Sequence, residues 1–159
     1  MRDLEAIIAT YGPALARVAA SYEADGALQE DLLQDVLLHI HRALPSLRDE
    51  SSLAAFVFRI AHNRGVSHVI RQSAERRRTF SQIVEEEPGP EQQLLASERA
   101  LRLTAAVRRL PLPYRQVLTL ILEDLSYAEI GEALGISPSN VGVRLNRAKP
   151  LLKELLGDL

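Results

Sequence analysis

The sequence predicts an all-α protein made of two small helical domains that are joined by a flexible acidic linker. The 159-residue chain is rich in Ala and Leu, has no Trp, and lacks the Val/Ile-rich alternating runs that strands would need. Residues 79–93 carry three consecutive glutamates and a Pro-Gly-Pro run, which cannot continue a helix. We therefore assign residues 1–78 to the first domain, 79–97 to the linker and 98–159 to the second domain.

The charge and cysteine content of the chain disfavour or exclude several classes of protein. With 19 Lys+Arg against 21 Asp+Glu the chain is slightly acidic, which is unfavourable for a protein that binds DNA unaided. The charges are uneven, however, because residues 85–98 hold five glutamates and residues 99–159 hold nine cations against six acids. The absence of cysteine excludes a disulfide framework and thiolate metal sites and fits a reducing cytoplasm. An apolar run near the N-terminus is too short to span a membrane, so we expect no membrane insertion and a cytoplasmic location.

Helical periodicity predicts three helices in the first domain. The first covers residues 3–24 and is expected to bend or break near Pro13. The second covers 28–43 and is closed by Pro45. A long third helix covers 52–77.

One face of the second helix is apolar and consists of Leu33, Val36, Leu37, Ile40 and Leu44. At 100° per residue, Leu38 falls on the opposite side, among Asp31, Gln34 and Asp35. A leucine ringed by acids and amides is a candidate docking patch for a partner, although single exposed leucines are common.

The third helix combines an apolar stripe with a basic face. Its expected buried stripe is Leu53, Phe56, Val57, Ile60 and Ala61. Phe58, Arg59 and His62 lie off that stripe, and a run of polar and cationic residues follows them. Rings beside cations suit single-stranded nucleic acid, because bases stack on the rings and phosphates pair with the cations. The alternative places both phenylalanines in the core and treats the basic run as a solvated helix end, and the residues alone favour it.

The second domain is predicted to hold four helices, at about 92–109, 114–123, 126–134 and 138–156. A Leu-Pro-Leu-Pro run at 110–113 separates the first two of them.

The last two helices have the signals of a helix-turn-helix. Ser126 and Glu129 form an S-x-x-E capping box that opens a short helix. Gly135 supplies the left-handed conformation that ends this helix sharply. Ser137 caps the next helix, and Pro138 occupies its first position, where no N–H is needed.

The final helix has the two faces of a recognition helix. Val141 and Leu145 form its buried stripe, and polar side chains occupy the other side. An amide and three cations outside an apolar face suit the groove of DNA. The alternative is an ordinary helical hairpin with a solvated basic face.

Taken in order, four segments resemble the bacterial RNA polymerase sigma factors of the extracytoplasmic-function (ECF) class. D-L-L-Q-D-V at 31–36 is similar to that family's polymerase-binding helix, and A-L-P-S-L-R at 43–48, followed by S-S-L, is similar to its promoter-melting loop. F-V-F-R-I-A-H-N at 56–63 is similar to the family's W-L-Y-R-I-A-R-N. Residues 110–148 resemble its upstream-element domain, which contains the helix-turn-helix.

The resemblance implies a transcription initiation factor rather than an enzyme, with no cofactor and no metal. It would bind core RNA polymerase, direct it to promoters through the minus-ten and minus-thirty-five elements, and aid strand opening. Its implied partners are core polymerase, promoter DNA and an anti-sigma factor. The implied polymerase-binding residues are Asp31, Gln34, Asp35 and Leu38. The implied minus-ten residues are Ser46, Arg48, Ser51, Phe56, Phe58, Arg59, Asn63, Arg64, His68 and Arg71. The implied minus-thirty-five residues are Ser139, Asn140, Arg144, Arg147 and Lys149.

Several positions depart from the family pattern. The family usually has Trp at Phe56 and Tyr at Phe58, so stacking area and a hydroxyl are lost here. Asn140 replaces a common Thr, and Gly142-Val143 replaces a polar pair that is often Lys/Arg-Ser. Gly142 removes a cation that normally touches DNA, and we expect Val143 to pack against the protein.

Three other functions stay open at this stage. A stand-alone helix-turn-helix regulator would bind duplex DNA tightly without polymerase, which the overall acidity disfavours. An enzyme is disfavoured because no H-E-x-x-H, P-loop or nucleophile-elbow pattern occurs. A protein that only sequesters polymerase would bind the core enzyme without melting a promoter.

Overall fold

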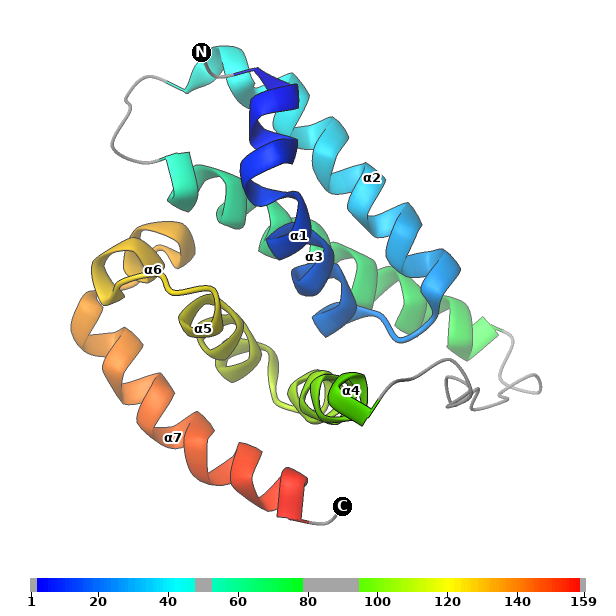
Figure 1. The fold of residues 1–159 in the computed structure, drawn as a ribbon, viewed down its shortest axis with the longest axis vertical. Helices are drawn as coiled ribbons and strands as arrows, with labels where there is room; N and C mark the ends of the chain where they lie inside the picture. Colours follow the sequence, from blue (N-terminus) through cyan, green and yellow to red (C-terminus); the bar gives the residue numbers. More distant parts are fainter. Residues whose placement is uncertain (1–2, 48–52, 79–94, 158–159) are drawn as a thin grey trace.

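A computed structural model describes residues 3–47, 53–78 and 95–157, and all regular structure in these ranges is helical (Figure 1). The elements are α1 (Leu4–Tyr22), α2 (Gly26–Ala43), the 3₁₀ turn η1 (Leu44–Ser46), α3 (Leu53–Arg78), α4 (Leu95–Arg108), α5 (Leu112–Leu122), α6 (Tyr127–Leu134) and α7 (Pro138–Gly157). Every predicted helix is present with ends close to those expected. Most of the predicted linker, residues 79–94, lies outside the described residues. Within the described ranges, no helix has the length and apolarity needed to cross a bilayer.

The first bundle consists of α1, α2 and α3. Asp3 caps α1 by accepting a hydrogen bond from the Ala6 N–H at 2.8 Å, and Asp25 caps α2 in the same way. Of the bend or break expected near Pro13, the break is wrong, because α1 continues through this residue. Apolar residues on both sides of Pro13, such as Ile7 and Leu15, are buried in the same core. Their burial outweighs the roughly 3 kcal/mol that an internal proline costs.

The second bundle consists of α4 to α7. The predicted capping box is confirmed: the Glu129 N–H donates to Ser126 Oγ at 3.1 Å, and the Ser126 N–H donates to Glu129 Oε1 at 2.8 Å. Gly135 ends α6 with φ 73°, in the left-handed region. The turn between α6 and α7 is tight, since a Cβ on Gly131 would lie 2.5 Å from the Ile136 carbonyl oxygen. The sequence therefore builds the predicted helix-turn-helix.

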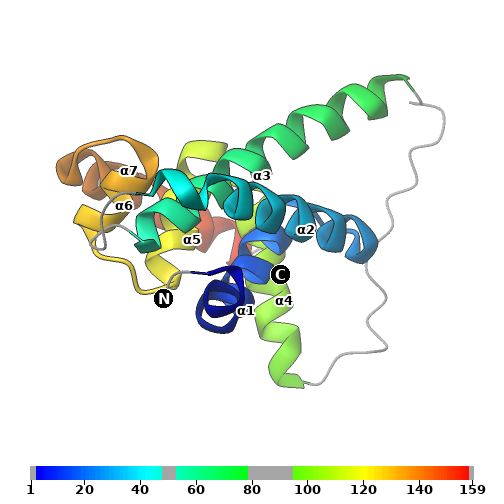
Figure 2. The ribbon, with the colours of Figure 1, turned by 90° about the horizontal axis from the view of Figure 1, so that it is seen from above.

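The two bundles pack on each other and share one hydrophobic core. Figure 1 shows α6 beside the first turns of α3, and α5 beside α1. Seen from above, the last turns of α3 run away from the second bundle (Figure 2). The first half of α3 is therefore covered by the second bundle, whereas its last turns are not.

Candidate nucleic-acid interface

The outward face of α7 carries the polar side chains that the sequence assigns to the minus-thirty-five element. Ser139, Arg147 and Lys149 are exposed, and Asn140 and Arg144 are half-buried. Within the described part of the chain, no hydrogen bond or ion pair engages the side chains of the three cations. These cations are therefore available to phosphates or base edges.

The opposite face of α7 fixes the helix to its own bundle. Val141, Leu145 and Ala148 are at most 3% exposed. At the start of the helix, the Asn140 N–H donates to the Ser137 hydroxyl oxygen at 3.0 Å, as the predicted cap requires. A helix held this firmly presents its outward side chains in a fixed register.

Two residues on the outward face of α7 were not among the predicted DNA-binding residues. Asn146 is exposed one turn before Pro150, and it presents an amide that can bond a base edge. Val143 was expected to pack, but 45% of it is exposed. The helical spacing of 139, 143, 146 and 147 was sufficient to place both on this face.

The patch on α2 lies as the sequence predicts. Asp31 and Gln34 are exposed, and Leu38 is 44% exposed, so an apolar side chain stands among polar ones. Asp35 is half-buried, and it accepts a hydrogen bond from Arg64 Nε of α3 at 2.8 Å. Arg64, which the resemblance assigns to DNA, is thus bonded to a residue assigned to polymerase.

The two phenylalanines at the start of α3 are not buried in the order that the predicted apolar stripe indicates. Phe56 is half-buried, but Phe58 is only 2% exposed and packs edge-on against Tyr11, with ring centroids 5.8 Å apart. His62 is also buried, at 1% exposed. The core interpretation that the residues favoured is therefore confirmed for Phe58, and the off-stripe position of His62 did not indicate its burial, because α1 and the second bundle cover a second face of α3.

Arg59 of α3 reaches the end of α6 in the second bundle. Its guanidinium donates to the carbonyl oxygens of Glu132 at 2.7 Å and Ala133 at 3.4 Å. These carbonyls belong to the last turn of α6, where a cation is favoured by unsatisfied acceptors and by the helix dipole. In this arrangement the guanidinium of Arg59 is occupied by protein.

The other predicted minus-ten residues differ in their exposure to solvent. Asn63 and Arg71 are exposed on α3. His68 is buried, and its Nε2 lies 2.7 Å from Glu23 Oε1. Ser46 is exposed in η1, where its hydroxyl donates to the Ala43 carbonyl. The two remaining predicted residues, Arg48 and Ser51, lie outside the described residues.

Two further arginines join the bundles. Arg17 of α1 makes a bidentate ion pair with Glu123 at the end of α5, with both N–O distances at 2.7 Å. This hydrogen bonding raises the pKa of Arg17. Arg108 of α4 donates to the Ala20 carbonyl near the end of α1 at 2.6 Å. With Arg59, three arginines among the described residues form hydrogen bonds to the other bundle, and two of them bond carbonyls near the end of a helix there. Arg115 of α5 also reaches the first bundle, with its guanidinium carbon 5.5 Å from the centroid of the Tyr22 ring.

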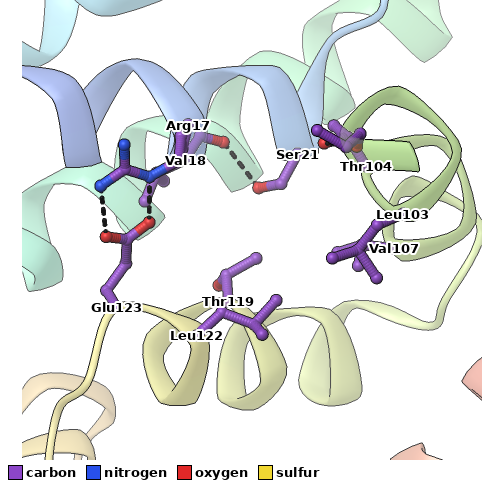
Figure 3. Close-up of a pocket in the computed structure, with 10 residues that line it drawn as sticks. Arg17, Val18, Ser21, Leu103, Thr104, Val107, Thr119, Leu122 and Glu123 are labelled. Carbon is purple, nitrogen blue, oxygen red and sulfur yellow. Dashed lines mark hydrogen bonds and ion pairs between the residues drawn. The ribbon is translucent and has the colours of Figure 1, made fainter. Parts of the chain in front are cut away.

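The packing between the bundles is incomplete beside the Arg17–Glu123 pair. A largely apolar cavity of about 270 Å³ lies between α1, α4 and α5 (Figure 3). Val18, Leu103 and Leu122 line it. The pocket opens to solvent, since 49% of Leu122 is exposed. The interface therefore combines the shared hydrophobic core with polar contacts beside this open pocket.

A buried chain of hydrogen bonds also crosses between the bundles. His62 Nδ1 lies 2.6 Å from the Tyr22 hydroxyl, and its Nε2 lies 3.2 Å from Thr119 Oγ1. Because the Thr119 hydroxyl donates to the Gln116 carbonyl, it accepts from Nε2–H, and the Tyr22 hydroxyl donates to Nδ1. Burial lowers the pKa of His62 from 6.5 to about 3, so the ring is neutral at pH 7.

This neutral histidine predicts a loss of stability in acid. Between pH 6.5 and about 3 the unfolded chain protonates His62 and the folded chain does not, so stability falls as pH falls. The expected contribution approaches about 1.4 kcal/mol per pH unit inside that window and vanishes above it. Urea unfolding at several pH values, compared between the wild type and His62→Gln, measures this slope.

The exposed His41 offers a matched control for that measurement. His41→Gln should keep the wild-type slope, because it leaves the buried His62 and its hydrogen bonds unchanged. If the unfolding free energy of the wild type and of His62→Gln fell equally steeply with pH, His62 would not be the cause of the acid destabilisation.

Comparisons with known proteins identify both halves of the chain. Residues 7–75 match the family model "Sigma-70 region 2", and residues 100–152 match "Sigma-70, region 4". RNA polymerase sigma factor SigZ of Bacillus subtilis is 30% identical over 134 residues, which are 83% of this chain and 74% of SigZ. ECF RNA polymerase sigma factor SigW of the same organism is 26% identical, over 82% of this chain and 76% of SigW.

The fold agrees with these matches. The sigma factor RpoE of Bartonella quintana, solved as a co-crystal with the anti-sigma factor NepR, superposes with a TM-score of 0.77. It is 24% identical, and the alignment covers 99% of this chain and 98% of RpoE. Region 2 coincides with the first bundle and region 4 with the helix-turn-helix bundle. This chain therefore belongs to the sigma-70 family of RNA polymerase sigma factors, in its ECF class, and is a promoter-specific initiation factor rather than an enzyme.

Proposed function

We propose that α7 reads the minus-thirty-five element in the major groove, while α3 and the loop before it hold the melted minus-ten strand. The observation that carries the proposal is the outward face of α7, where Arg144, Arg147 and Lys149 lack protein partners within the described residues. Ser139 and Asn140 stand at the helix start, where backbone N–H groups also favour phosphate.

The proposal assigns core polymerase to the patch on α2. Leu38 supplies the apolar contact there, and Asp31, Gln34 and Asp35 surround it with acceptors. Asp35 is held in place by Arg64, so its position is set before any partner arrives. Polymerase supplies the nearby charge and DNA affinity that this slightly acidic chain lacks.

Strand capture in this scheme requires the two bundles to separate. Phe58 is buried and Arg59 is bonded to α6, so neither can meet a flipped base in the packed arrangement. We assign the packed arrangement to the free protein and a separated one to the promoter complex. The RpoE structure contains an anti-sigma factor, and we assign to this chain a cytoplasmic partner of the same kind. The domain limits in this proposal are 1–78, 79–97 and 98–159.

The double substitution Arg144→Ala/Arg147→Ala should reduce initiation mainly at promoters that depend on the upstream element. Each lost phosphate or base contact removes about 1–3 kcal/mol, so the combined loss is expected to exceed tenfold. In vitro transcription with core polymerase, on matched promoters with and without that element, measures the difference. The matched control Arg102→Ala removes an exposed cation of α4. An equal loss on both promoters would contradict the role of α7.

The same assay separates the proposal from its alternatives. Purified chain and core polymerase are offered a library of promoters, and open complexes are scored with and without the chain. Opening that depends on the chain supports the proposal. Tight duplex binding without polymerase would indicate a stand-alone regulator, and core binding without opening would indicate a sequestering protein.

A further inference from the structure

We propose that Val143 contacts a thymine methyl group in the upstream promoter element and so helps to select the promoters that this chain uses. The inference rests on the proposed role of α7 and adds one base preference to it. Its starting observation is that Val143 is 45% exposed although the core side of α7 is already filled by Val141 and Leu145. The fold therefore does not need an apolar side chain at this position.

Val143 lies at the centre of the face that would enter the groove. At 100° per residue, Ser139 stands one turn before it and Arg147 one turn after it, with Asn140 and Asn146 on its flanks. Every one of these neighbours is polar. A single apolar group in the middle of a polar reading surface is the arrangement expected where one base presents a methyl group among hydrogen-bonding edges.

Thymine is the base that presents such a group. In the major groove it exposes a C5 methyl group, which adenine, guanine and cytosine lack. A valine opposite those bases would leave their polar groups unpaired, which is costly. The β-branched side chain is also stiff at χ1, so little rotamer entropy is lost when the contact forms.

The test removes only the methyl group from the DNA. A promoter library first defines the upstream element that the wild-type holoenzyme selects. Each thymine of that element is then replaced singly by deoxyuridine, and open-complex formation is measured on both templates. We expect one replacement to reduce open complexes by about fourfold, on the order of the effect of burying one methylene group.

Variants at position 143 connect that effect to the valine. The thymine-to-uracil ratio is the amount of open complex on the thymine template divided by that on the uracil template. Val143→Ala should bring this ratio close to one. Val143→Thr, which keeps a γ-methyl group, should retain most of the wild-type preference for thymine. Leu156→Ala is the matched control, because Leu156 is an exposed apolar residue 13 positions further along α7, or roughly 20 Å away. This control should keep the full ratio, and helical circular dichroism verifies that each variant is folded.

Three results would overturn the inference. The selected element could contain no thymine, or no single uracil replacement could reduce open-complex formation by the wild-type holoenzyme. The third is a Val143→Ala holoenzyme that shows the same loss on the uracil template as the wild type. If Val143→Ala instead weakened core binding with no effect of uracil, the valine would belong to a protein contact. Failure to open any promoter would count against the proposed function itself, and this outcome is distinct because no ratio could then be measured.

Discussion

Leu38→Asp is expected to reduce the affinity for core polymerase by at least about a hundredfold. The substitution removes an apolar contact worth roughly 1.5–3 kcal/mol and places a charge where the partner offers apolar surface. Because Leu38 is 44% exposed and the core of α2 is formed by Leu32, Val36 and Ile40, the fold should be unaffected. Fluorescence titration of labelled chain with core enzyme measures the affinity, and thermal melting verifies the fold.

Ile8 of α1 is a suitable matched residue, since it is 42% exposed and no role is assigned to it. Ile8→Asp introduces the same charge on an equally exposed apolar site of the same bundle. It should leave core affinity within about twofold of the wild type. If Leu38→Asp and Ile8→Asp behave alike, the patch on α2 is not the polymerase-binding surface.

Gly131→Ala is expected to lower the melting temperature by up to about 8 °C. The added Cβ would lie 2.5 Å from the Ile136 carbonyl oxygen, and a backbone atom cannot move away as a side-chain tip can. Overpacking of this kind costs about 1–3 kcal/mol or more, which exceeds the roughly 1 kcal/mol that alanine gains in helix propensity. Each kcal/mol shifts the melting temperature of a chain this size by roughly 2–4 °C. Differential scanning calorimetry measures the shift.

Gly142, on the neighbouring helix, provides the opposite case. A Cβ there would meet only the Tyr127 ring edge, at 3.4 Å, an ordinary contact with a movable side chain. Gly142→Ala should therefore stabilise the protein by up to about 1 kcal/mol. A similar destabilisation in both variants would mean that close approach at the turn does not explain the glycine at 131.

Local chemistry made the helix-turn-helix predictable. The cap at Ser126, its partner Glu129 and the left-handed Gly135 each act over three or four residues, so their geometry follows from spacing alone. The outward position of Leu38 followed from the helical period in the same way. These features depend on no distant part of the chain.

The helical period did not predict the burial of Phe58 and His62, although a core position for Phe58 was the favoured of two interpretations. Their partners include Tyr11 and Thr119, which are 47 and 57 positions away in the chain. A helical stripe indicates which face is most apolar, but it does not indicate that a second bundle will cover another face. The unbroken α1 has a similar origin, since tertiary burial overrode the local effect of Pro13.

The hydrogen bonds that Arg17, Arg59 and Arg108 form between the bundles have a thermodynamic consequence. Contacts through Arg17, Arg59 and Arg108 favour the packed form, and in the function proposed above only the separated fraction captures a melted strand. The apparent affinity for that strand is the intrinsic affinity reduced by this fraction. In that proposed scheme these contacts set a threshold concentration for transcription, and a substitution that weakens one of them is expected to make the factor active at lower abundance without altering any atom that touches DNA.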